Sequence, residues 1–148
     1  MRRNLPLLLI RVLVGIVFIT EGVLKFVFPG ELGVGRFAHI GLPVPHILAP
    51  FVAVVEIVSG AAVLFNIYTG EAAALLLCVI LTALVTTKLP FLLGHAIWRF
   101  GAPKSGLRHG VLAFVHEART DLSMLFCLLA ILIDSGVRLR SPTEWYQR

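Results

Sequence analysis

Two ionisable side chains lie inside an otherwise apolar segment near the N-terminus. The run Leu5–Phe28 carries Glu21 and Lys25, four residues apart. In a helix this spacing puts both side chains on one face, and a glutamate that precedes a lysine is the favourable order for an ion pair. A carboxylate held in an apolar segment can carry a proton, and an ammonium group can bind an oxygen or an anion. These two residues are therefore the first candidates for chemistry.

A second carboxylate, Glu56, interrupts another apolar run and has no basic residue within one helical turn. A lone carboxylate in such a place must face a neighbouring helix or an aqueous cavity, or become protonated. Lys25, Lys88 and Arg119 are the bases that could meet it. The full set of candidates for a polar intramembrane pocket is Glu21, Lys25, Glu56, Thr86, Lys88, Glu117, Arg119 and Asp121.

The composition places these charges in a membrane protein. The chain of 148 residues is 58% hydrophobic and 14% charged, and its mean hydropathy is +0.94. Soluble domains have about 25% charged residues. The net charge of +5 comes from basic residues dispersed at the ends of apolar runs, where they match lipid headgroups. We therefore expect the lipid bilayer as a partner and nucleic acid as none.

The elements that must hold these residues are membrane helices. We predict an all-α fold, an integral membrane four-helix bundle with short interfacial helices, in a single domain over residues 1–148. The first run is too long for a signal peptide and is expected to be retained as a helix. The predicted spans cover about residues 5–28, 49–67 and 70–89, followed by a fourth that ends at 136.

The start of the fourth span is open, because Leu122–Ile133 alone is too short to cross the ~30 Å hydrocarbon core. Thr120 as an N-cap would give about 17 residues, whereas a start near Val111 would carry three charged residues into the outer half of the membrane. Short helices are predicted before Gly41 and from Ser141, which begins a capping-box pattern.

The predicted topology gathers the polar candidates in one half of the bundle. An even number of spans puts both termini on one side, and Arg2, Arg3, Arg138, Arg140 and Arg148 favour the cytoplasm for that side. Small residues allow close helix contact. The helix-packing candidates are Gly15, Gly22, Ser59 and Gly60, and they would bring Glu56 near Glu21 and Lys25. Arg11, Asp134 and Arg138 lie in the other half and are interpreted as interface anchors.

Two other interpretations compete with a functional pocket. Buried charges can fix helix register, and long side chains near span ends can reach water. The two cysteines, Cys78 and Cys127, lie in apolar segments and are expected to pack as small hydrophobic residues rather than form a redox pair. The five histidines fall in loops or at span ends, so neither a metal site nor haem ligation is predicted.

Three stretches resemble the DoxX-like family of small four-helix membrane proteins. They are "LLIRVLVGIVFITEGVLKFVFP", "GLPVPHILAPFVAVVEIVSGAAVLFNIYTG" and "EARTDLSMLFCLLAILIDSG". The most specific parts are Gly22-x-x-Lys25, the G-L-P sequence, Glu56 with Gly60, and R-T-D-L. The resemblance implies the bacterial cytoplasmic (inner) membrane. It also implies association with sulfur oxidation beside a quinone or with oxidative-stress complexes, while eukaryotic relatives act as assembly chaperones for membrane receptors.

Three functions follow as hypotheses. The first is a redox-associated accessory subunit of a membrane oxidoreductase, with a pocket for a quinone headgroup or a small sulfur compound and a membrane or periplasmic redox protein as partner. Its catalytic residues are not assigned, and quinone is the only cofactor suggested. The alternative is a non-catalytic scaffold or assembly factor that holds partners with its small-residue helix faces. A small transporter is the third. A homo-oligomer or a subunit of a complex is expected in each case.

Overall fold

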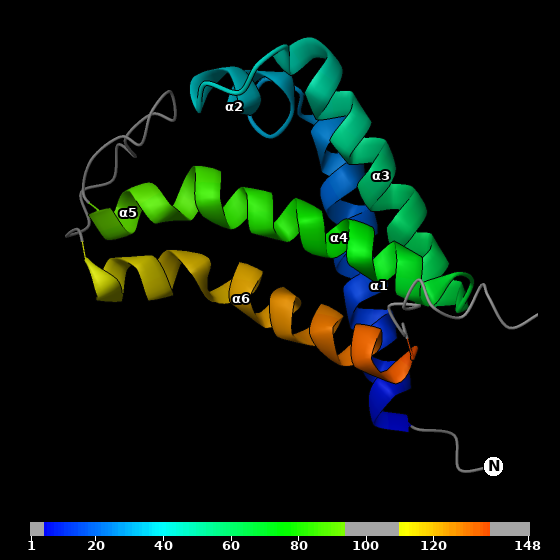
Figure 1. Cartoon of the computed structure of the whole chain (residues 1–148). Helices are drawn as coiled ribbons and strands as arrows, with labels where there is room; N and C mark the ends of the chain where they lie inside the picture. Colours follow the sequence, from blue (N-terminus) through cyan, green and yellow to red (C-terminus); the bar gives the residue numbers. More distant parts are fainter. Residues whose placement is uncertain (1–4, 94–109, 137–148) are drawn as a thin grey trace, which may run out of the picture.

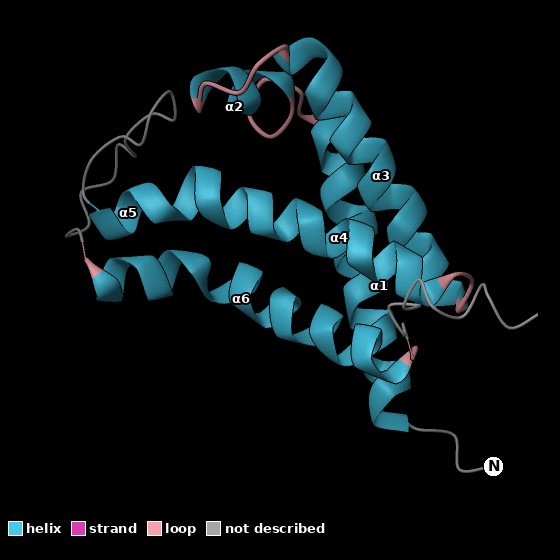
Figure 2. Cartoon of the chain, in the orientation of Figure 1, coloured by secondary structure: helices cyan, strands magenta, loops and turns pink. Residues whose placement is uncertain are grey.

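The computed structural model describes residues 5–93 and 110–136, and this part of the chain is built of helices and short loops without a strand (Figures 1 and 2). The prediction of an all-α fold is confirmed. The elements are α1 (Leu5–Val27), α2 (Val34–His39), α3 (Pro45–Phe65), α4 (Thr69–Ala83), the π-helical turn η1 (Leu84–Lys88), α5 (Leu89–Leu93) and α6 (Val111–Asp134).

Three helical segments are long and apolar enough to cross a membrane: Leu5–Val27, Pro45–Phe65 and Thr69–Lys88. The fourth long helix, α6, has 24 residues, but its first half carries Glu117, Arg119 and Asp121. Its start at Val111 matches the earlier of the two starts that the sequence left open. The polar first half of α6 therefore belongs to the bundle, and its apolar second half packs in the core.

The long helices associate as two pairs. Helix α1 packs mainly against α3, and α4 packs mainly against α6. Figure 1 shows that the two pairs meet near the turn between α3 and α4 and separate toward α2 and α5. The buried apolar core fills the region where they meet, with Val14, Val63, Leu76, Leu128 and Ile131 almost inaccessible. The separated end is where the polar candidates lie.

The turn between α3 and α4 is only Asn66, Ile67 and Tyr68. Asn66 and Tyr68 adopt left-handed conformations, with φ of 60° and 45°. Asparagine tolerates this conformation better than most residues and commonly ends a helix in it. The Asn66 side-chain oxygen accepts a hydrogen bond from Thr69 Oγ1 at 3.0 Å, which ties the end of α3 to the start of α4.

Two prolines, Pro50 and Pro90, lie inside helical segments close to the predicted ends of the second and third spans. Helix α3 begins at Pro45, so Pro50 lies within it rather than marking its first turn. Pro90 does not end the third span, since the chain continues as α5 after the π-helical turn. A proline ring clashes with the carbonyl four residues earlier. The wider turn relieves this conflict, and Leu89 N–H bonds to Leu84 O instead.

Helix α2 ends at His39, and Gly41 follows with a φ of 82°, the conformation that the prediction required of it. The capping-box sequence from Ser141 lies outside the described residues. So do the terminal arginines on which the predicted orientation depends.

Candidate functional site

Glycines allow α1 and α3 to lie very close together. A Cβ atom on Gly22 would lie 2.6 Å from Ala53 O and 2.6 Å from Ile57 Cγ1, and one on Gly15 would lie 2.9 Å from Gly60 O. Real Cβ atoms do not approach other atoms so closely, so any larger residue would push the helices apart. The predicted packing glycines all lie in this seam, and Ser59 is buried beside Gly60.

The close seam places Lys25 of α1 against Glu56 of α3. Lys25 Nζ donates to Glu56 Oε2 at 2.7 Å, and the side chains are only 12% and 6% exposed. Glu21 lies farther away, with its Oε2 3.7 Å from Lys25 Nζ and its side chain 53% exposed. Lys25 also donates to the Glu21 backbone carbonyl at 3.4 Å. Lys25 is therefore the base that meets Glu56, and its stronger contact is across helices rather than within α1.

A second ion pair lies across from the first. Lys88, the last residue of η1, places its Nζ 3.7 Å from Asp121 Oδ2 of α6. Both side chains are largely covered, with exposures of 15% and 24%. The π-helical turn before Pro90 sets the direction of Lys88, and turns of this kind are frequent at functional sites. Each ion pair therefore joins the two members of one helix pair.

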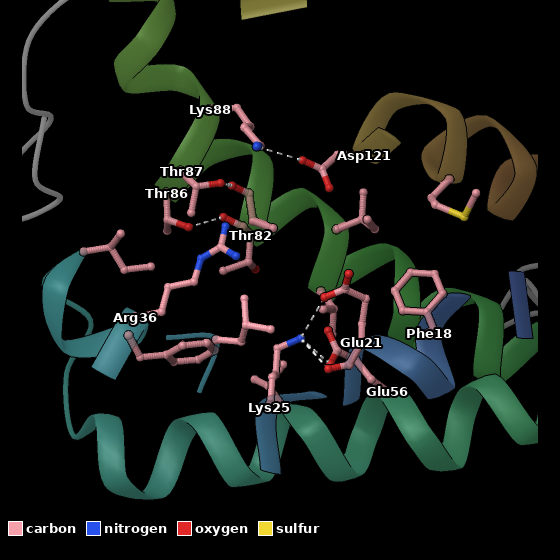
Figure 3. Close-up of a pocket in the computed structure, with 18 of the residues that line it drawn as sticks. Phe18, Glu21, Lys25, Arg36, Glu56, Thr82, Thr86, Thr87, Lys88 and Asp121 are labelled. Atoms are coloured by element: carbon pink, nitrogen blue, oxygen red, sulfur yellow. Dashed lines mark hydrogen bonds and ion pairs between the residues drawn. The ribbon is translucent and has the colours of Figure 1, made fainter. Parts of the chain in front are cut away.

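A cavity of about 500 Å³ lies between the two ion pairs. Its walls come from α1, α2, α3, α4, η1 and α6, and Figure 3 shows their side chains converging on one space. Phe18, Phe37, Leu48 and Met124 supply much of the apolar wall. Sites for small molecules commonly have volumes of ~300–1,000 Å³, apolar walls and a few fixed polar groups. The cavity has all three properties.

Three threonine hydroxyl groups in the cavity wall donate hydrogen bonds to backbone carbonyls of the same helical segment. Thr82 donates to Cys78 O at 2.8 Å, Thr86 to Thr82 O at 2.8 Å, and Thr87 to Ala83 O at 2.6 Å. Threonine often bonds in this way inside helices. Carboxylates only accept hydrogen bonds when ionised. The donors left to a ligand are therefore the N–H groups of basic side chains and the hydroxyl of Thr120, which also lines the cavity.

All of the predicted pocket residues except Arg119 line this cavity. Arg119 is exposed and turns to its own helix, where its Nη1 lies 3.0 Å from His116 Nε2 and donates to His116 O at 2.9 Å. Glu117 and Asp121 are one turn apart on α6, whereas Arg119 lies between them in sequence and on the other face. This spacing was a signal in the sequence that separates Arg119 from the pocket.

Sequence reasoning did not include Arg36 among the pocket candidates. Arg36 belongs to α2 and lines the cavity, and Figure 3 shows its side chain extending between α2 and α4 toward Thr82. Among the residues that the structure describes, no carboxylate forms an ion pair with it. Its role could not be found from spacing, because the position of α2 depends on the fold of a loop.

The other end of the bundle has a polar cluster of its own. Arg11 Nη1 donates to Asn66 Oδ1 at 2.6 Å, and Arg11 Nη2 lies 3.4 Å from Asp134 Oδ2. These contacts tie α1 to the turn after α3 and to the end of α6. The sequence suggested that Arg11 and Asp134 are interface anchors. In the structure they contact each other, and Arg138 lies outside the described residues.

Comparisons with known proteins agree with this architecture. The family model of DoxX matches residues 6–89, which covers α1 to the start of α5 and therefore Lys25, Glu56 and Lys88. An uncharacterized membrane protein of Mycobacterium tuberculosis, Rv3486, is 44% identical over 124 residues, covering 83% of this chain and 71% of the relative. No solved structure matches the chain.

Proposed function

The chain belongs to the DoxX family, and we propose that it is a redox-associated accessory subunit whose cavity binds a quinone headgroup or a small sulfur compound. The observation that carries the proposal is the Lys25–Glu56 ion pair, 2.7 Å long and almost inaccessible, in the wall of a cavity of about 500 Å³. An ionisable pair inside a membrane is costly, about 2.5–3.5 kcal/mol per charge on insertion scales. A ligand that uses the pair gives it a purpose beyond packing.

The chemistry of the lining favours a ligand with acceptor oxygens. Lys25, Arg36 and Lys88 are the basic groups in the wall, and three of its four threonine hydroxyls already donate to backbone carbonyls. A hydrogen bond from a charged donor is worth about 1.5–3 kcal/mol. Quinone carbonyls and sulfur oxyanions both present suitable acceptors. Donor-only ligands such as amines would find only carboxylates that are already paired with lysines or partly exposed.

The residues fit a quinone ring in size as well as in polarity. Apolar side chains, with Phe18 and Phe37 among them, form most of the wall, and basic groups enter it from both helix pairs and from α2. Lys25 and Arg36 would hold a carbonyl oxygen, and Glu56 or Glu21 would hold a proton nearby. A bound quinone supplies two-electron redox chemistry coupled to protons. The protein contributes position, exclusion of water and a proton at a carboxylate.

On this proposal the protein works in the bacterial inner membrane, with both termini in the cytoplasm, beside a membrane or periplasmic redox protein that acts on the same ligand. The accessory role follows from the cysteines. Cys78 is exposed and Cys127 is partly buried, and neither forms a disulfide, so electrons have no thiol pair to use within the described part of the chain.

The scaffold alternative loses part of its support. It needs the small-residue faces of α1 and α3 to receive a partner, but Gly15, Gly22 and Gly60 already face one another across the α1–α3 seam. A Cβ atom on Gly15 or Gly22 would lie within 3.0 Å of the opposite helix, and one on Gly60 would lie 3.1 Å from Gly15 O, so a partner helix has no access to these positions. A scaffold would have to use other surfaces.

A binding titration tests the proposal. The protein is purified in lipid nanodiscs and titrated with a benzoquinone that has a short alkyl tail, and separately with thiosulfate. The isosteric double variant Lys25→Met/Glu56→Gln removes both charges without leaving one unpaired. We expect it to weaken binding of the preferred ligand at least tenfold, because one charged hydrogen bond is worth a factor of about ten or more.

The matched controls are Arg119→Met and Glu71→Gln, which remove the same kinds of charge outside the cavity. They should bind like the wild type, and circular dichroism should show equal helix content in all variants. If the double variant binds both ligands as tightly as the wild type, or if the wild type binds neither, the proposed function is wrong.

A further inference from the structure

The cavity opens through the membrane-facing side of α4. Cys78 and Thr82 both line the cavity and both are exposed on the surface of the bundle. They are one turn apart on the same face of the helix. A residue that borders a cavity and is also exposed indicates an opening, so the cavity reaches the surface at this height of α4. Glu21, Arg36 and Thr120 also line the cavity and are exposed, so the cavity is open at these polar residues as well.

This opening lies deep in the membrane. The span Thr69–Lys88 has 20 residues, and Cys78 is the tenth of them. At 1.5 Å per residue, Cys78 is about 15 Å from each end of the span. The hydrocarbon core of a bilayer is about 30 Å thick. The exposed edge of the cavity therefore faces lipid tails near the middle of the bilayer rather than water.

The opening is apolar in character, unlike the inner end of the cavity. The Thr82 hydroxyl donates its proton to Cys78 O at 2.8 Å, which satisfies the polar part of that side chain. Val79 and Ile80 adjoin it in the wall. The Lys25–Glu56 pair lies on the opposite helix pair, on α1 and α3. The lining is thus apolar around Cys78, and it is charged at the α1–α3 seam and at the Lys88–Asp121 pair.

We infer that the resident ligand is a membrane amphiphile whose polar, oxygen-bearing head lies near Lys25 and whose long apolar tail passes Cys78 and Thr82 into the bilayer. The inference rests on the proposed function and narrows its ligand class. A water-soluble sulfur oxyanion could enter past the exposed polar residues of the lining, but desolvation would make its passage through the opening at α4 costly. The opening at α4 therefore suits a ligand with an apolar tail. An isoprenoid or acyl tail enters such an opening without cost and then remains in lipid.

The first experiment narrows the opening. Cys78→Phe and Thr82→Phe each add bulk at the opening, while Leu75→Phe and Leu81→Phe place the same phenyl group at exposed α4 positions outside the cavity wall. The probes are a benzoquinone with a decyl tail and the same benzoquinone without a tail. Binding is measured in nanodiscs, with affinity expressed per mole of lipid so that partitioning of the tail does not contribute.

We expect the two opening variants to weaken binding of the decyl quinone at least tenfold and to leave the tailless quinone within twofold of the wild type. The two control variants should change neither. The wild type should bind the decyl quinone at least tenfold more tightly than the tailless one.

A second measurement does not depend on bulky substitutions. In a Cys127→Ala background, a nitroxide spin label on Cys78 reports collisions with oxygen, which concentrates in lipid, and with a water-soluble nickel chelate. We expect strong collision with oxygen and weak collision with nickel. Addition of the decyl quinone should lower the oxygen collision rate, and the tailless quinone should not.

The outcomes separate this inference from the proposed function. If both quinones bind equally well and none of the phenylalanine variants changes their affinity, the inference of a tail that passes through this opening is wrong, while the proposed function stands. Strong nickel access at Cys78 would overturn the inference by showing that the opening faces water. If the wild type binds neither quinone, the inference and the quinone form of the proposed function both fail.

Discussion

At the scale of single residues, Lys25 and Glu56 depend on each other. They are 12% and 6% exposed and their charged atoms lie 2.7 Å apart, so water can replace neither partner. Glu21 differs, because it is 53% exposed and 3.7 Å from Lys25. Removing one member of a buried ion pair leaves an uncompensated charge, whereas removing both leaves only a change of packing. The pair should therefore act as one unit.

This dependence gives a measurable coupling. We expect Lys25→Met to lower the free energy of unfolding by about 3 kcal/mol or more, since it leaves Glu56 buried without a partner. The double variant Lys25→Met/Glu56→Gln should lose less than the single variant. Reversible denaturation in mixed detergent micelles measures both values.

Glu21→Gln is the control for this measurement, and it should cost less than about 1 kcal/mol because exposed ion pairs contribute little. Additive losses from Lys25→Met and Glu56→Gln would show that the two side chains do not interact in the folded protein.

At the scale of elements, the seam between α1 and α3 determines whether that ion pair can form. Gly22 is one turn before Lys25 and packs on Ala53, one turn before Glu56. The separation of the helix backbones at Gly22 and the position of the charges are therefore linked. The η1 turn likewise positions Lys88, because it sets the direction from which that side chain reaches Asp121.

We predict that Gly22→Ala destabilises the protein by about 1–3 kcal/mol, the usual cost of overpacking a close contact. The new Cβ would meet Ala53 O and Ile57 Cγ1, both at 2.6 Å. Gly30→Ala is a suitable control, because a Cβ there would meet nothing within 4 Å. Thermal unfolding followed by circular dichroism compares the two. Equal stability of Gly22→Ala and the wild type would mean that the seam is looser than the structure has it.

Much of this arrangement could be predicted from particular residues. The small residues of α1 and α3 and the depth of Glu56 together indicated that Glu56 would lie near Lys25. The i, i+4 spacing of Glu117 and Asp121 also placed them on one face of α6. The same rule puts Arg119 on a different face of the helix and so separates it from the pocket. Pro90 signalled a break but not its form, because a proline can end, kink or widen a helix depending on what packs around it.

At the scale of the whole molecule, two polar clusters divide the bundle into a closed end and an open end. Arg11 joins the two helix pairs at the closed end through Asn66 and Asp134. At the open end each ion pair stays within one helix pair, and a cavity occupies the space between them. The sequence predicted that the two polar clusters lie in opposite halves of the bundle. It could not predict that one end is closed and the other open, because that depends on how the pairs separate and on where the loop places Arg36.

The central claim is that this cavity holds an oxygen-bearing ligand drawn from the membrane. Its most direct test is to purify the protein in native nanodiscs, extract the lipid and measure quinone per phospholipid by mass spectrometry. We predict that the wild type and Arg119→Met enrich quinone several-fold over the surrounding membrane, and that Lys25→Met/Glu56→Gln does not. The same quinone content in all three samples as in the bulk membrane would contradict the claim.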